Sequence, residues 1–144
     1  SVSHHEVLRE DVYTMDTGSP HYLQFVNALA DLDIVDFGRR IRYSPHYEED
    51  GINVNAIEEN GSKELKIRTY ERGVEDETLS CGTGITAAAI AFVVKNKLEG
   101  RQEITCESLG GQLKVKLNRE SDQEFIEIRL IGPAKHVFKG SIDV

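Results

Sequence analysis

Hydrophobic and polar residues alternate along several segments of the chain, the pattern expected of half-buried β-strands. In residues 11–26, two apolar segments flank the turn sequence DTGSP. Residues 52–59 (INVNAIEE) and residues 62–71 (SKELKIRTYE) also alternate, and they lie on either side of Asn60-Gly61. Because Asn-Gly is a preferred turn of two-residue hairpins, these segments predict a hairpin whose first strand is half-buried.

Two other segments carry a helical pattern instead. Within residues 26–43, apolar side chains from Val26 to Ile34 recur at helical spacing and predict a helix. Residues 83–98 form the stronger candidate, which Asn96 to Gly100 would end. This segment is rich in alanine and apolar on most sides, as is typical of a buried helix.

Residues 102–120 and 124–144 alternate again and predict further hairpins. The sequence contains no internal repeat, linker or low-complexity tract that would divide it. The predicted fold is therefore α+β, with a curved mixed or antiparallel sheet, similar to a β-roll or barrel. This sheet wraps around one central helix of small residues, whose alanines allow strands to approach closely.

Composition narrows the class of protein. The chain has 144 residues, 39% of them hydrophobic and 29% charged, which fits one globular domain. A net charge of −8 argues against a nucleic-acid partner. No apolar run approaches the roughly 20 residues that span a bilayer, so we expect no membrane association.

The cysteines and the N-terminus bear on localisation. Two distant cysteines make no disulfide framework, and five scattered histidines give no zinc-ligand spacing. We therefore expect no metal and a cytoplasmic location. The polar N-terminus lacks the apolar core of a signal peptide, and the only methionine is Met15. We expect the chain to be a processed product or a piece of something longer.

Cys81 stands at the predicted start of the alanine-rich helix, followed by Gly82, Thr83 and Gly84. Free N–H groups and the helix dipole stabilise anions at such a position and favour a thiolate over a thiol. The two glycines let a ligand lie close to the backbone, and Thr83 can cap the helix or donate to that ligand. We predict that Cys81 meets an anionic ligand and changes its protonation state.

The other cysteine has no such setting. Cys106 lies within EITCES, an alternating segment, and we interpret it as a structural core residue. The CGTG sequence alone is not specific, because glycine-rich turns before helices bind phosphates in many proteins. However, the sequence contains no GxxxxGK[ST] and no GxGxxG after a strand, so a nucleotide site is not supported.

Four segments together resemble diaminopimelate epimerase, and in particular its second half. They are DTGSPHYLQFV, GINVNAI, YERGVEDETLSCGTG and the alanine-rich helix. The resemblance runs from Asp16 to the closing GPAKHVFKGSIDV, and its most specific part is the block from ERG to CGTG. Proline racemase and phenazine-biosynthesis relatives share the fold but differ in these blocks.

The resemblance implies an enzyme that inverts the α-carbon of diaminopimelate, from the LL to the meso form, in lysine and peptidoglycan biosynthesis. This family uses no pyridoxal phosphate, metal or other cofactor. Two cysteines on opposite faces of the substrate exchange roles as base and acid, and Cys81 matches one of them. Such general acid–base chemistry on a weakly acidic C–H bond needs a dry site that stabilises a carbanion.

The resemblance assigns further roles. Glu71 and Arg72 match a pair that contacts the substrate's ammonium and carboxylate groups. Glu71 also joins His21 as a residue that tunes the thiols. Asn53 matches a substrate-binding asparagine. Each residue also has a structural alternative. Glu71 and Arg72 could form an ion pair in a solvated loop, His21 could be a turn residue, and Asn53 could bond its own backbone.

Three further positions complete the predicted site. Gly82 and Thr83 would offer backbone N–H groups to the substrate. Ser19 stands where the family pattern has asparagine, and its hydroxyl offers fewer donors and a shorter reach than an amide. The segment between Glu71 and Cys81 is one residue longer than the family pattern, which a loop can absorb.

The family's other cysteine lies in a first half with a motif like ACGNG, which this sequence lacks. We therefore expect residues 1–144 to be the C-terminal lobe of a two-lobed enzyme, inactive without its N-terminal lobe. The last strand, about 135–144, should pack partly with that lobe. In its absence, Val137, Ile142 and Val144 would be displaced, disordered or used in a dimer contact.

Other functions remain open at this point. A related racemase or isomerase could act on a different small amino acid. A non-catalytic lobe could keep the anion site and lack the chemistry. A thiol hydrolase is a weaker possibility, because no histidine lies in a context suited to its base.

Overall fold

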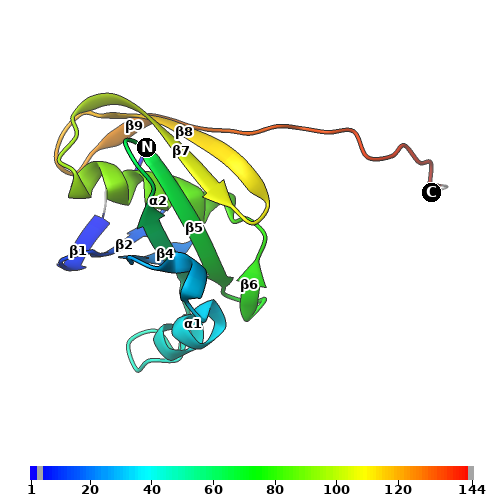
Figure 1. Cartoon of the computed structure of the whole chain (residues 1–144), viewed down its shortest axis with the longest axis horizontal. Helices are drawn as coiled ribbons and strands as arrows, with labels where there is room; N and C mark the ends of the chain where they lie inside the picture. Colours follow the sequence, from blue (N-terminus) through cyan, green and yellow to red (C-terminus); the bar gives the residue numbers. More distant parts are fainter. Residues whose placement is uncertain (3–4, 143–144) are drawn as a thin grey trace.

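A computed structural model describes residues 1–2 and 5–142 of the chain (Figure 1). The strands are β1 (His5–Arg9), β2 (Val12–Asp16), β3 (Pro20–Phe25), β4 (Asn53–Glu59), β5 (Glu64–Glu71), β6 (Asp76–Thr78), β7 (Gly100–Ser108), β8 (Gly111–Arg119) and β9 (Phe125–Ile131). The helices are α1 (Ile34–Arg42) and α2 (Gly82–Lys95), with a short 3-10 turn, η1 (Leu29–Asp31).

The strands form one mixed sheet in the order β1-β2-β3-β4-β5-β7-β8-β9, with β6 paired to β5. The β3–β4 and β5–β7 pairs are parallel and the other pairs are antiparallel. The sheet curls around α2, and α1 lies on the other side of its central strands (Figure 1). The predicted fold class, a curved mixed sheet around one small-residue helix, is confirmed.

Helix α2 is buried along most of its length, as its composition predicts. It contacts strands β2 to β5 and β7 to β9. Ala87, Ala88, Ala89 and Ala91 have no exposed surface, so the strands lie close to the helix axis on several sides. The helix begins one residue before its predicted start and ends at Lys95, three residues before its predicted end.

The hairpin predicted around Asn60-Gly61 is confirmed, because β4 and β5 pair antiparallel in register Val54↔Tyr70 to Glu59↔Leu65. The prediction of a half-buried strand at 52–59 is wrong. The first five residues of β4 are buried on both faces, with Val54 and Ala56 in the core around α1. Asn53 and Asn55, which face the opposite side, are 4% and 0% exposed.

The helix predicted over 26–43 is shorter than the pattern indicated. Only Ile34–Arg42 is α-helical, because Asp33 caps it by accepting a hydrogen bond from the N–H of Asp36 at 3.0 Å. Buried Gly38 lets this helix pack directly on the side chain of Tyr70. The apolar residues before Asp33 belong to η1 and to the turn after β3.

Two strands were not predicted. Strand β1 lies in the polar N-terminal segment, where only His5 is buried, so no alternation reveals it. Strand β6 lies within the segment between Glu71 and Cys81, which was expected to be a loop, and it pairs with the end of β5.

The hairpins predicted for 124–144 are only partly present. Strand β9 pairs with β8, but residues 132–142 contain no strand and run away from the body of the molecule (Figure 1). Val137, Phe138 and Ile142 are 86%, 82% and 85% exposed. Val144 lies outside the described residues. What this segment packs against stays a prediction.

Candidate active site

Cys81 is the N-cap residue of α2, with extended backbone angles (φ −119°, ψ 108°). The first main-chain hydrogen bond of the helix runs from the N–H of Ile85 to the carbonyl of Cys81, at 2.8 Å. The preceding N–H groups, on residues 82–84, have no partner within the helix and point toward its N-terminal side. The Cys81 side chain is half-exposed rather than buried in apolar packing, so its sulfur lies beside a place where an anion is stabilised.

Thr83 connects the sulfur to the strands. Its hydroxyl lies 3.4 Å from Cys81 Sγ, 2.9 Å from His21 Nε2 and 3.1 Å from Ser19 Oγ. Ser19 Oγ in turn lies 3.0 Å from His21 Nε2. The main chain of Thr83 is also tied to the β2–β3 turn, because its carbonyl accepts a hydrogen bond from the hydroxyl of Thr17 at 2.8 Å. Four residues predicted from the sequence therefore form one polar cluster at the tip of α2.

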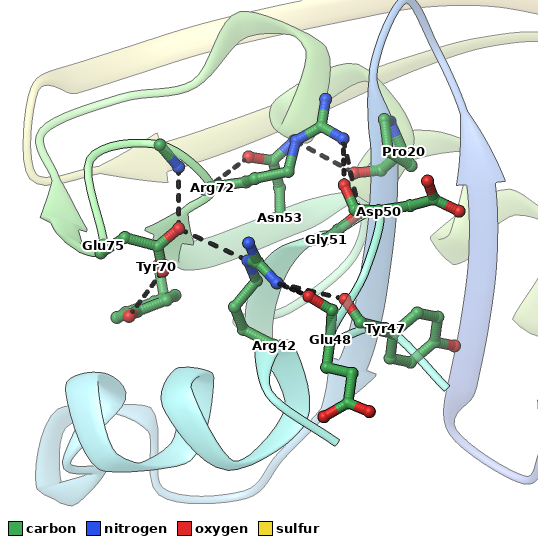
Figure 2. Close-up of polar contacts among 11 residues, drawn as sticks. Pro20, Arg42, Tyr47, Glu48, Asp50, Gly51, Asn53, Tyr70, Arg72 and Glu75 are labelled. Carbon is green, nitrogen blue, oxygen red and sulfur yellow. Dashed lines mark hydrogen bonds and ion pairs between the residues drawn. The ribbon is translucent and has the colours of Figure 1, made fainter. Parts of the chain in front are cut away.

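Asn53 joins this cluster from the start of β4. Its side-chain amide donates to Ser19 Oγ at 3.2 Å and to the carbonyl of Pro20 at 3.0 Å. Its side-chain oxygen accepts from the main-chain N–H of Arg72 at 2.9 Å (Figure 2). The amide therefore holds β3, β4 and the end of β5 together at the site.

The side chain of Arg72 is held by the loop before β4. Its guanidinium donates to the carbonyl of Asp50 at 2.8 Å and to that of Gly51 at 3.4 Å (Figure 2). This segment is also held from the other side, because Arg42 donates to the carbonyls of Tyr47 and Glu48. The loop before β4 is thus fixed by two arginines, and Arg72 is exposed beside it.

Glu71 ends β5 and is half-exposed. Its main-chain carbonyl accepts from the N–H groups of Val74 and Glu75, at 3.2 and 2.8 Å, and so shapes the turn before β6. Within the part of the chain that the structure describes, the Glu71 carboxylate makes no hydrogen bond or ion pair. The structure therefore does not bring Glu71 into the cluster, although β5 carries it to the same end of the sheet.

Sequence reasoning missed Asn55 and Thr69. Asn55 donates to His21 Nδ1 at 3.1 Å and to the carbonyl of Tyr22 at 3.0 Å, and it accepts from the hydroxyl of Thr69 at 2.9 Å. Both residues are buried. The available signal was the second asparagine of NVN, which shares a strand face with Asn53.

Burial controls the ionisation of His21. The ring has no exposed surface, and this burial lowers its pKa to about 4, although the nearby Asp16 opposes the shift. His21 is therefore neutral at pH 7. Burial acts in the opposite direction on Cys106, whose pKa is raised to about 12 within the core. The prediction that Cys106 is structural is confirmed.

Residues 1–2 and 5–142 offer neither a metal-binding cluster nor a membrane-spanning helix. No group of three or more histidine, cysteine or acidic side chains in this range is arranged to hold a metal ion. No helix in the same range is long and apolar enough to cross a membrane.

Solved structures place the chain in a class of fold. A hydroxyproline epimerase from Agrobacterium vitis superposes with a TM-score of 0.52, over 81% of this chain and 40% of that protein, at 11% identity. A PhzF-family phenazine biosynthesis protein from Bacillus anthracis gives 0.51, over 86% and 38%, at 18% identity. At these identities the likeness concerns the fold alone, which this chain shares with both proteins.

Sequence comparison then identifies the family. The diaminopimelate epimerase family model matches residues 13–137. Diaminopimelate epimerase of Flavobacterium psychrophilum is 46% identical over 138 residues, covering 95% of this chain and 53% of that protein. The enzyme of Archaeoglobus fulgidus is 40% identical over 136 residues, covering 94% and 45%. The chain belongs to the diaminopimelate epimerase family, and it spans about half the length of the curated relatives it matches.

Proposed function

We propose that the protein containing this chain interconverts LL- and meso-diaminopimelate, with Cys81 as one of two acid/base cysteines. Family membership supports the reaction, and the half-exposed sulfur at the tip of α2 supports the role of Cys81. As a thiolate, Sγ takes the α-proton while the C–H electron pair moves into the substrate carboxylate. A second thiol on the opposite face then delivers a proton to the α-carbon. In the reverse direction the two sulfurs exchange roles.

The residues around Cys81 are proposed to bind and stabilise the substrate. The N–H groups of Gly82 and Thr83 stabilise the charge that develops on the carboxylate as the proton leaves. Glu71 and Arg72 bind the ammonium and carboxylate groups at the substrate's ends. Ser19 and Asn53 are bonded to each other and border the same cluster, so we propose that they shape its wall.

The second cysteine is proposed to lie in an N-terminal lobe, so the chain alone is expected to be inactive. The exposed segment 132–142 is proposed to pack against that lobe or in a homodimer. A cytoplasmic location stays a prediction, supported by the two unpaired cysteines.

Exchange of the substrate α-proton with solvent tests the proposed reaction. In deuterium oxide, the full-length protein should introduce deuterium at the α-carbon of diaminopimelate, because each inversion delivers a solvent-derived proton. Proline and hydroxyproline are the control substrates, since they lack the second charged end that Glu71 and Arg72 are proposed to recognise. NMR measures the incorporation. Exchange of proline but not of diaminopimelate would identify a different racemase, and no exchange of any substrate would favour a non-catalytic lobe.

A further inference from the structure

We propose that Asn55 is a positioning residue that selects the tautomer of His21 and thereby directs a hydrogen bond onto Cys81 Sγ. This inference rests on the proposed function of Cys81. No part of the sequence resemblance assigns a role to Asn55.

The orientation of the Asn55 amide is fixed by a carbonyl. The main-chain oxygen of Tyr22 can only accept, and it lies 3.0 Å from Asn55 Nδ2. Turning the amide over would place two oxygens against each other in a buried site. The hydroxyl of Thr69 donates to the side-chain oxygen from the opposite side, at 2.9 Å. Nδ2 is therefore the atom that faces His21.

This orientation determines the tautomer of His21. Asn55 Nδ2 is a donor and lies 3.1 Å from His21 Nδ1, so Nδ1 must accept and carries no proton. The neutral ring then carries its proton on Nε2. Protonation of Nδ1 would set two donors against each other where neither residue has exposed surface, which also explains why the ring stays neutral.

The hydroxyl of Thr83 can then accept hydrogen bonds from both His21 and Ser19. With its proton on Nε2, His21 donates to Thr83 Oγ1 at 2.9 Å or to Ser19 Oγ at 3.0 Å. Ser19 already accepts from Asn53, so its own hydrogen is available for Thr83 Oγ1 at 3.1 Å. Because Thr83 receives these hydrogens, its own hydroxyl hydrogen is free to point at Cys81 Sγ, 3.4 Å away.

The other tautomer would reverse this arrangement. An unprotonated Nε2 would accept a hydrogen from Thr83 Oγ1, at 2.9 Å, or from Ser19 Oγ, at 3.0 Å, and whenever Thr83 donates to the ring the sulfur loses its donor. Hydrogen bonds to charged acceptors are stronger than neutral ones, so the donated bond strengthens when Sγ carries the negative charge needed for proton transfer. His21 therefore acts through Thr83 as a hydrogen-bond donor, and it does not take the Cys81 proton at Nε2.

Close packing around Gly84 keeps Asn55 and His21 in place. A Cβ on Gly84 would lie 2.6 Å from Asn55 Oδ1 and 3.3 Å from His21 Cε1. The first turn of α2 can therefore lie against Asn55 and His21 only because residue 84 has no side chain.

The tautomer can be measured directly in full-length protein labelled with 15N-histidine. Loss of signals in His21→Gln assigns the His21 ring nitrogens. At pH 7, wild-type protein should show Nδ1 without a proton and Nε2 with one. Asn55→Asp replaces the donor by an acceptor, so Nδ1 should gain a proton. The matched control is Asn60→Asp, the same change at an exposed turn residue, which should leave the His21 signals as in wild type.

A second measurement follows the reactivity of the sulfur. Thr83→Ala should slow iodoacetamide alkylation of Cys81 at pH 7 about tenfold, the effect of one lost hydrogen bond to a charged group. Thr83→Ser, which keeps a hydroxyl, should restore most of the rate. Mass spectrometry of the peptide containing Cys81 separates its reaction from that of buried Cys106.

The inference is overturned if wild-type Nδ1 is protonated, if Asn55→Asp leaves Nδ1 bare, or if Thr83→Ala alkylates as fast as wild type. If Asn55→Asp does not fold, Asn55→Ala replaces it: the signals should then average between two tautomers, and an unmixed Nε2–H form would contradict the proposal. None of these readouts requires turnover. If the α-proton of diaminopimelate exchanges but His21 Nδ1 is protonated, only this inference is rejected. If Nδ1 carries no proton but diaminopimelate does not exchange, only the proposed function is rejected.

Discussion

At the scale of single residues, the site depends on a buried histidine that is neutral because of its surroundings. Burial lowers the pKa of His21 to about 4, whereas in the unfolded chain it returns to the ordinary value of 6.5. Below pH 6.5 the unfolded state therefore binds a proton that the folded state does not. This contribution to stability is complete above pH 6.5, and it is lost as the pH falls toward 4.

We expect the free energy of unfolding to decrease by about 3 kcal/mol across this window through His21 alone. Urea denaturation at several pH values measures the effect. His21→Gln should flatten the acid limb of the stability curve, while His46→Gln, at an exposed position, should preserve its slope. An acid limb that is equally steep in His21→Gln would show that other groups cause it.

The sequence was sufficient to predict most residues of the cluster around Cys81, and insufficient to find Asn55, which bonds the His21 ring, and Thr69, which bonds Asn55. Cys81 and His21 stand in recognisable contexts, a helix start and an SPH turn. Asn55 was missed because an alternating strand was taken to have one solvated face. That face is instead covered by α2, so both asparagines of β4 are buried. Only the three-dimensional packing distinguishes the two cases.

At the scale of elements, α2 brings the sulfur to the strands by close approach. Gly84 is a point of close contact, because a Cβ there would lie 2.6 Å from the side-chain oxygen of buried Asn55. That oxygen cannot move freely, because Asn55 is held by Tyr22 and Thr69.

Gly84→Ala should therefore lower the free energy of unfolding by about 2 kcal/mol, since overpacking outweighs the gain in helix propensity. Gly82→Ala is the matched control in the same helix. Its Cβ would meet only the end of the half-exposed Leu130 side chain, at 3.1 Å, so the change should stay within about 1 kcal/mol. Equal effects in thermal or urea denaturation would contradict a specific contact at Gly84.

The prediction of elements succeeded where one pattern ran along a whole segment. The alanine-rich run and the Asn60-Gly61 turn each gave the observed structure. The prediction of one helix over 26–43 was wrong because the apolar spacing continues across Asp33, whose side chain caps the start of α1. Strand β1 was not predicted because four of its five residues are exposed, so the sequence shows no alternating apolar face there.

At the scale of the whole molecule, the C-terminal segment 132–142 forms no strand of the curled sheet. Residues 132–142 run away from the sheet (Figure 1), and three of their apolar side chains are more than four-fifths exposed. Apolar groups exposed in this way are typical of a surface that another body covers. Together with coverage of about half of each relative, this supports the proposal that the site is completed by another lobe.

The role of Cys81 in proton transfer is tested most directly by α-proton exchange in two cysteine variants of the full-length protein. Cys81→Ala should reduce deuterium incorporation into diaminopimelate by about a thousandfold or more, because it removes one acid/base group. Cys106→Ala, a change in the core, should retain exchange close to that of wild type. Exchange that persists at the wild-type rate in Cys81→Ala would contradict the account of this site.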